Sequence, residues 1–281
     1  MSITSAMYSG VSGLMANAEN MSVIGNDLSN VNTAGYKGAR MLFSDVFSAS
    51  VGNNSQIGRG TQIQAVENIF GQETFETTTS ATDLAIQGDS FFVLGNTPIT
   101  NSTAFTAPAD ATEVNLTRAG AFTLVADAGV ADQYILVNPD GYPVLDTAGK
   151  LLMVSPATAG LGVTVSSVGT DGSIAAVDST GAAATVSGTG KIGTLSVTDK
   201  AELTKISGTM YSADAKAWKT VPTTYVTGAA DTINSYSLEQ SNVDMATQFV
   251  NMILTQRAYS ANSKTITTSD EMIQEVISLK R

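Results

Sequence analysis

Residues 4–32 read TSAMYSGVSGLMANAENMSVIGNDLSNVN, and every seventh residue from Met7 onward is a large apolar side chain. These residues are Met7, Leu14, Met21 and Leu28, and the smaller Thr4, Val11, Ala18 and Gly25 alternate with them. Spacings of four and three are typical of the contact stripe of a coiled-coil helix. The stretch therefore predicts a long helix over residues 1–32, and Gly35 is suited to a left-handed cap after it.

A second heptad stripe lies at the other end of the chain. Its large members are Met245, Met252, Tyr259, Ile266 and Ile273, and the interleaved positions are Phe249, Gln256, Ser263, Asp270 and Ile277. Ser241 or Asn242 is expected to cap the helix, with Asp244 near its positive end. The threonines at 265, 267 and 268 have low helix propensity, so a break there is possible. The pattern predicts a helix within residues 236–281.

The middle of the chain has a different character, because Thr, Ser, Gly and Ala dominate it and apolar residues come in short runs. The predicted strands are 84–86, 91–94, 121–125, 134–137 and 194–198, with a turn at 138–141 and further short strands within 160–190. We therefore expect an α+β protein: paired coiled-coil-type terminal helices, an extended connector over 33–75, and a β-rich middle domain over 76–235.

Composition excludes several functional classes. The 281 residues contain no cysteine and no histidine, and 25 acidic side chains against 14 basic ones give a net charge of −11. Phosphate backbones are bound mainly by Lys and Arg, so nucleic acid is not an expected partner. Without His and Cys, the commonest metal ligands and the usual general base are missing. No apolar run is long enough for membrane insertion, and residues 1–7 do not resemble a cleavable signal peptide.

No motif predicts an enzyme, a metal site or a cofactor. Ser263 and Lys264 are adjacent on a helix surface and point in different directions. The segment 188–191 resembles a phosphate loop, but it lacks the earlier glycine and has Ile192 where a magnesium-binding hydroxyl is needed. The pairs 140–141 and 171–172 lack the spaced oxygen ligands of a calcium loop. We interpret these segments as turns or solvated faces.

The two heptad stripes have two readings. One is an intramolecular hairpin packed as an ordinary core, and the other is a hairpin that also packs against copies of itself. The N-terminal stripe is interrupted by Gly and Ala, so a single helix of this composition gains little to offset its entropy cost. We therefore predict a polymer-core interface formed by Met7, Val11, Leu14, Met21, Leu28, Met245, Phe249, Met252, Tyr259, Ile266 and Ile273.

Four sequence blocks resemble those of bacterial flagellar rod and hook proteins. The N-terminal block is SGVSGL at 9–14 followed by MSVIGNDLSNVNTAGYK at 21–37. The central blocks are DLAIQGDSFF at 83–92, with Asp89-Ser90 as a departure from the usual pattern, and LTRAGAF at 116–122. The C-terminal block runs from LEQSNVD at 238–244 through VNMI and QRAYSANSK to TSDEM at 268–272.

Within that family the resemblance leaves two alternatives. The run 237–244 is most similar to hook proteins, and 48–60 is short for the insertion expected of distal rod proteins. Against this, the chain is shorter than many hook proteins and has one middle domain. The preferred expectation is the flagellar hook, a curved hollow tube that transmits torque as a flexible joint between rod and filament. The alternative is a distal rod component of the basal body.

The resemblance also implies partners and a location. The expected partners are further copies of the chain, other flagellar axial and junction proteins, a hook cap and the type III export apparatus. The chain would leave the cell without a cleaved signal and reside in the extracellular part of the flagellum. Freedom from cysteine is compatible with passage into an oxidising space.

Two other classes compete with this reading. One is a soluble enzyme or binding module with a helical hairpin, and the other is a chaperone-like or secreted adhesin filament. A low charged fraction of 14% disfavours a polar ligand site. Helix content in dilute solution discriminates, because an axial protein should gain helix when it polymerises.

Overall fold

The computed structural model describes residues 3–46, 49–52, 55–99, 101–102, 105, 107–218, 220–225 and 231–279. The chain forms two compact units. The helical unit comprises Met1–Val31, Lys37–Ile69 and Val243–Arg281, and the β unit comprises Asn32–Tyr36 and Phe70–Asn242. The predicted connector is thus divided, because its residues from 37 to 69 group with the helices.

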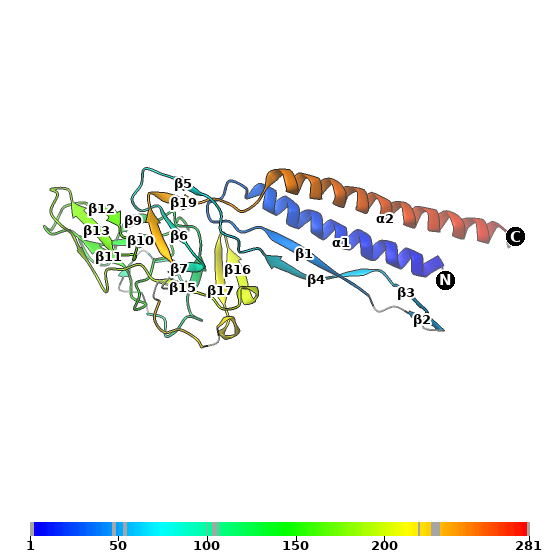
Figure 1. Cartoon of the computed structure of the whole chain (residues 1–281), viewed down its shortest axis with the longest axis horizontal. Helices are drawn as coiled ribbons and strands as arrows, with labels where there is room; N and C mark the ends of the chain where they lie inside the picture. Colours follow the sequence, from blue (N-terminus) through cyan, green and yellow to red (C-terminus); the bar gives the residue numbers. More distant parts are fainter. Residues whose placement is uncertain are drawn as a thin grey trace. The chain divides into compact units, whose positions relative to one another are not determined.

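The helical unit contains the two long helices, α1 (Ile3–Ser29) and α2 (Met245–Leu279), which run antiparallel with the chain termini at one end (Figure 1). Asp244 begins α2, because its carboxylate accepts hydrogen bonds from the backbone N–H groups of Ala246 at 3.1 Å and Thr247 at 3.3 Å. The predicted caps, Ser241 and Asn242, therefore lie outside the helix. α2 is continuous through the predicted break at 265–268, where the threonine hydroxyls bond carbonyls of the preceding turn.

α1 ends earlier than predicted. Its last residue is Ser29, and the amide of Asn30 still bonds the carbonyl of Asn26 at 3.2 Å. Gly35 has the predicted left-handed backbone, with φ of 68°, but it lies six residues beyond the helix. Its N–H donates to the carbonyl of Glu239 at 2.7 Å inside the β unit, so its conformation serves that contact instead of a helix cap.

A two-stranded ribbon completes the helical unit. Strands β1 (Ala39–Asp45) and β4 (Thr61–Asn68) pair antiparallel, with a register shift after Leu42, and the short β2 (Ala49–Gly52) and β3 (Ser55–Ile57) form a second hairpin between them. Asp27 of α1 fixes the start of β1, since its buried carboxylate accepts from the amide of Ala39 at 3.1 and 3.2 Å.

The described residues of the β unit form a five-stranded sheet, a four-stranded sheet and three two-stranded pairs. The five-stranded sheet has the order β15 (Thr194–Ser196), β7 (Ser90–Leu94), β8 (Asn115–Thr117), β17 (Met210–Ala213) and β16 (Leu203–Ser207). The four-stranded sheet has the order β14 (Thr185–Val186), β11 (Met153–Ser155), β10 (Tyr134–Val137) and β9 (Thr123–Ala126). The pairs are β12 (Val163–Val168) with β13 (Ile174–Asp178), β18 (Thr232–Ser235) with β6 (Leu84–Gln87), and β19 (Ser237–Glu239) with β5 (Phe75–Thr77).

Strand β7 lies between β15 and β8 and is buried on both faces. Side chains alternate along a strand, so Phe91 and Val93 enter one hydrophobic cluster while Phe92 and Leu94 enter the other. The first cluster also holds Tyr211, whose ring packs edge-on against Phe91 at 6.4 Å between centroids. A continuous apolar run is the pattern expected of such a strand. All five predicted strands overlap observed ones.

Tight turns in the β unit share one design. In three of them, the side chain of the first residue accepts hydrogen bonds from the backbone N–H groups two and four residues later. The fourth residue of each is a glycine with positive φ. These turns start at Asn138, Asp146 and Asp178. The left-handed backbone at the fourth position is what favours glycine there. The predicted turn at 138–141 is confirmed, and Asp140-Gly141 belongs to it.

Candidate assembly interface

Most of the contacts that the structure records between α1 and α2 involve polar or small residues. Asp27 accepts from the side-chain amide of Gln248 at 3.4 Å, and the amide of Asn20 donates to the Thr255 hydroxyl at 3.0 Å. One heptad further, Gly13 lies against Asn262, where a Cβ atom on Gly13 would come within 2.6 Å of the amide nitrogen. Successive contacts are seven residues apart on each helix and run in opposite directions along the two sequences. We call this row of three contacts the polar ladder.

The ladder has a second row of contacts beside it. A Cβ on Gly10 would lie 3.0 Å from the Ile266 side chain and 3.4 Å from the carbonyl of Asn262. Small residues let helices approach closely, and the glycines of α1, although they lower helix propensity, permit that approach here. Continuing the ladder by one more heptad brings Ala6 opposite Ser269, which is 1% exposed.

The ladder differs from the predicted stripe by one residue on α2. The interleaved prediction was Phe249, Gln256, Ser263 and Asp270, whereas the side facing α1 carries Gln248, Thr255, Asn262 and Ser269. Polar residues do recur at every seventh position of this part of the sequence, but a pattern defined by apolar residues does not detect them. Thr255 and Ser269 are the two buried residues of α2.

The predicted interface residues fall into two groups. Seven are partly buried in the single chain: Met7, Leu14, Met21, Leu28, Met252, Ile266 and Ile273. Four are exposed: Val11, Met245, Phe249 and Tyr259. The other contacts of the helical unit thus leave four of the eleven predicted residues exposed within its described residues.

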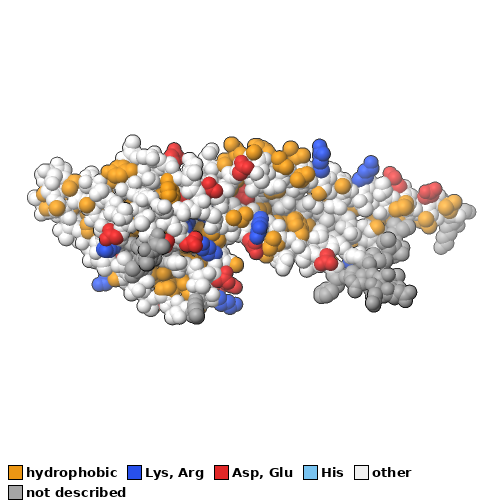
Figure 2. Space-filling view, viewed as in Figure 1, with side chains coloured by type: hydrophobic (Ala, Val, Ile, Leu, Met, Phe, Trp, Pro, Cys, Tyr) orange, Lys and Arg blue, Asp and Glu red, His pale blue; other side chains and the backbone are white. Residues whose placement is uncertain are grey.

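Further apolar residues are exposed on the helical unit, and the heptad pattern did not predict them. Tyr8 and Met15 of α1 are 75% and 68% exposed, and α2 adds Val250, Ile253 and Leu254. Figure 2 shows hydrophobic side chains gathered along the first half of α2. The ribbon contributes Phe43, Ile63 and Val66. Exposed apolar residues gathered on one part of a chain, as along the first half of α2, mark an interaction site.

In the β unit, the four sequence blocks quoted above converge on one buried ion pair. Nη1 of Arg118 lies 3.4 Å from Oε2 of Glu239, and their side chains are 5% and 0% exposed. Arg118 also donates to the carbonyl of Gly88 at 2.6 Å, and its guanidinium carbon lies 5.1 Å from the centroid of the Phe91 ring. Gly35 packs against the backbone of Ala119. The blocks therefore fix the points at which the chain enters and leaves the β unit.

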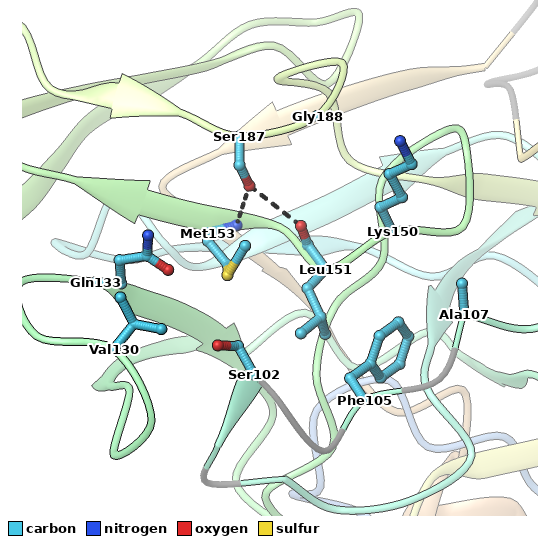
Figure 3. A pocket seen from close by; sticks show the side chains of 10 residues that line it. All are labelled: Ser102, Phe105, Ala107, Val130, Gln133, Lys150, Leu151, Met153, Ser187 and Gly188. Carbon is cyan, nitrogen blue, oxygen red and sulfur yellow. Dashed lines mark hydrogen bonds between the residues drawn. The ribbon is translucent and has the colours of Figure 1, made fainter.

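A surface pocket of about 400 Å³ lies elsewhere in the β unit (Figure 3). Its apolar lining includes Phe105, Leu151 and Met153, and the amine of Lys150 lies at its edge. The Ser187 hydroxyl is engaged, because it accepts from the Met153 amide at 3.0 Å and donates to the Leu151 carbonyl at 3.3 Å. The lining of the pocket is thus largely apolar with one cation, Lys150, and it brings no nucleophile into contact with a base.

The described residues include no group of three or more Asp or Glu side chains placed to hold a metal ion. Among the helices in the described ranges, neither has the length and hydropathy needed to cross a bilayer. The surface that distinguishes this chain is therefore the apolar one on its helical unit.

Comparison with known proteins gives two family matches, one at each end of the chain. The family "Flagella basal body rod protein" matches residues 7–37, and "Flagellar basal body rod FlgEFG protein C-terminal" matches residues 234–279. These ranges cover most of α1 and the whole of α2, which carry the candidate assembly surface described above.

Individual relatives extend the similarity through the middle of the chain. The flagellar basal-body rod protein FlgG of Bacillus subtilis is 33% identical over 98% of this chain and 99% of its own length. FlgG of Borreliella burgdorferi is 28% identical over 98% of each chain. The flagellar hook protein FlgE of Rhizobium meliloti is 34% identical, but over 57% of this chain and 40% of its own length. The chain therefore belongs to the rod and hook family of structural axial proteins of the bacterial flagellum.

Proposed function

We propose that this protein is the distal rod subunit of the flagellar basal body. The observation that carries the proposal is coverage: similarity to FlgG rod proteins spans nearly the whole of both chains. Similarity to FlgE hook proteins spans roughly half of this chain and a smaller part of theirs. A hook protein therefore has much sequence for which this chain has no counterpart. The preference for hook over rod stated from sequence is reversed.

The segment 48–60 gives no argument against the rod reading. It was expected to be too short for a distal rod insertion, yet the alignment with the Bacillus subtilis rod protein covers 289 positions and 98% of this chain. The hook reading remains the second candidate, because the run 237–244 resembles hook proteins and because FlgE matches are 30–34% identical where they align.

In this proposal the helical unit forms the inner wall of a hollow polymer. The apolar residues that the polar ladder leaves uncovered would pack against neighbouring copies in a coiled-coil-like arrangement, at about 25 cal/mol for each Å² of apolar surface removed from water. The ribbon over 39–68 would lie between neighbouring subunits, and the β unit would make polar outer contacts. The chain itself performs no catalysis, and needs no cofactor.

The partners follow from that role. The chain would contact further copies of itself and the axial or junction proteins that precede and follow it. It would reach its site through the type III export apparatus without a cleaved signal, and would need a hook cap only if the hook reading holds. Its location would be the basal body, outside the cytoplasmic membrane.

Electron microscopy of basal bodies from a strain lacking this gene tests the proposal. We expect rods that end short and carry no hook, and restoration when the gene is supplied on a plasmid. A complete rod without a hook would support the hook reading and contradict ours. Complete rods with hooks would contradict both readings.

A further inference from the structure

Methionine is concentrated in the helical unit. The chain has ten methionines, and nine of them fall within the described residues. Seven of these nine belong to the helical unit, whereas Met153 and Met210 belong to the β unit. Three are exposed, and all three lie on the long helices: Met15 is 68% exposed, Met245 is 51% exposed and Met272 is 49% exposed. Met210, by contrast, is fully buried.

Each exposed methionine has an exposed apolar neighbour four residues away on its own helix. Side chains with this spacing are neighbours on a helix surface. The pairs are Val11 with Met15 on α1, and Met245 with Phe249 and Met272 with Val276 on α2. Each thioether therefore adjoins other apolar surface, and a polar group created at its sulfur would interrupt that surface.

The exposed thioethers are also the groups of this chain that an oxidant reaches most readily. Thiols and imidazoles do not compete with them, because the sequence has no cysteine and no histidine. The single tryptophan, Trp218, is 6% exposed within a hydrophobic cluster. Oxidation of methionine requires access to its sulfur atom. Met15, Met245 and Met272 are thus the most accessible targets in the described part of the chain.

We propose that Met15, Met245 and Met272 are reversible oxidation sites whose state decides whether a free subunit can assemble. The oxidant is a hydroperoxide: its O–O bond breaks, one oxygen atom binds the methionine sulfur, which gives up two electrons, and the other oxygen leaves as water or an alcohol. The sulfoxide is polar, so burying it among apolar side chains in a polymer is unfavourable. Methionine sulfoxide reductases would reverse the change. This proposal rests on the proposed role as a polymer subunit.

Peptide mass spectrometry of the free full-length chain tests the sites themselves. After brief treatment with hydrogen peroxide, we expect the three exposed methionines to gain an oxygen atom before Met153 and Met210 do, because their sulfur atoms are accessible. Unfolding the chain in urea before the treatment should abolish this order. Equal rates at all five positions in the folded chain would overturn the assignment.

Assembly of the oxidised chain tests the consequence. We expect oxidation to raise the critical concentration for polymerisation by about tenfold. Incubation with methionine sulfoxide reductases A and B and a thiol reductant should return it to within about twofold of the untreated value, because each enzyme reduces one sulfoxide epimer.

Variants identify the sulfur atoms responsible. The triple variant Met15→Leu, Met245→Leu and Met272→Leu should assemble like the unaltered chain and should not respond to peroxide, since leucine has a similar volume and no sulfur. Met153→Leu is the matched control, because it removes a sulfur from the β unit and should leave the sensitivity to peroxide unchanged.

The outcomes separate this proposal from the one on which it rests. Far-UV circular dichroism of the oxidised chain before assembly controls for folding, and a loss of helix signal there would attribute the effect to unfolding and overturn the proposal. An oxidised chain that assembles at the untreated critical concentration, or a triple variant that remains sensitive, would also contradict it. These results leave the rod function intact. A deletion strain with complete rods and hooks would instead overturn the rod function itself.

Discussion

Gly13 of α1 approaches Asn262 of α2 so closely that a Cβ atom on Gly13 would lie 2.6 Å from the amide nitrogen. The contact sits in a ladder whose other steps are Asn20 with Thr255 and Asp27 with Gln248. Polar contacts of this kind add little net stability, but they favour one register, because a shifted helix would leave them unpaired. The hairpin thus uses polar groups for its own alignment and leaves apolar surface for assembly.

We expect Gly13→Leu to push α1 away from α2. Overpacking a close contact costs about 1–3 kcal/mol, which exceeds the gain of about 1 kcal/mol in helix propensity. Gly25→Leu is the matched control, since nothing lies within 4 Å of a Cβ there and the same gain should appear without the clash. Thermal unfolding followed by far-UV circular dichroism should show opposite shifts, and equal shifts would contradict the close packing.

Leu14→Asp and Met252→Asp should each block assembly while the β unit stays folded. Both side chains are partly buried, and an aspartate in a desolvated polymer contact costs several kcal/mol. Ser22→Asp and Asn251→Asp introduce the same charge at exposed positions of the same helices and serve as controls. Polymer yield is measured by sedimentation, and folding of the β unit by protease resistance. Tubes of normal length from either variant would disprove the role of the helical unit in assembly.

Removing one partner of the Arg118–Glu239 pair should destabilise the β unit. Glu239→Gln leaves the guanidinium buried without its counter-ion, and breaking such a pair costs about 3–5 kcal/mol. Lys200→Gln breaks the exposed pair with Asp89, where Nζ and Oδ1 are 2.7 Å apart, and should cost less than about 1 kcal/mol. Urea denaturation with tryptophan fluorescence reports on the unit, because Trp218 lies in its core. Equal losses in the two variants would contradict a special role for the buried pair.

The start of α2 should be sensitive to acid. The Thr247 hydroxyl, and then the amides of Ala246 and Thr247, hold the pKa of Asp244 below its usual value by hydrogen bonding to the carboxylate. A lowered pKa in the folded state means that the stabilisation is complete above about pH 4 and is lost as pH falls through the folded pKa. Asp244→Asn keeps a capping oxygen but cannot titrate.

Acid titrations followed by far-UV circular dichroism compare the two proteins. The unaltered chain should lose more helix signal below about pH 4 than Asp244→Asn does, and the two should agree near neutral pH. Asp244→Ala should have a weaker helix at every pH. Parallel titration curves for the unaltered chain and Asp244→Asn would show that the cap makes no pH-dependent contribution.

Much of the fold was predictable because its signals are local. Period-seven stripes predicted both long helices, and the run Phe91-Phe92-Val93-Leu94 predicted a strand, which the structure shows to be buried on both faces. The turn beginning at Asn138 was also predictable, since Asn, Pro and Gly favour turns through their own backbone preferences. The four motif blocks likewise indicate the family, because each is a short contiguous stretch of sequence.

The sides on which the helices meet were decided by tertiary structure. Met245 and Phe249 belong to an apolar stripe, yet the side of α2 that faces α1 carries Thr255 and Asn262. A heptad pattern shows that a helix has a contact stripe, but it does not say whether the partner is the other helix of the same chain or a different copy. That choice depends on which surfaces fit closely, and here Gly10 and Gly13 allow the closer fit.

The buried ion pair of the β unit could not be predicted from the sequence either. Arg118 and Glu239 are 121 residues apart and lie in blocks that the sequence presents as separate. Only folding brings them into one buried pair: β19, which carries Glu239, pairs with β5, and Gly35 lies against Ala119, the residue after Arg118. The sequence alone determined the elements and the family, through local periodicity and motif content. The tertiary structure decided which residues share a surface, because that depends on contacts between distant segments.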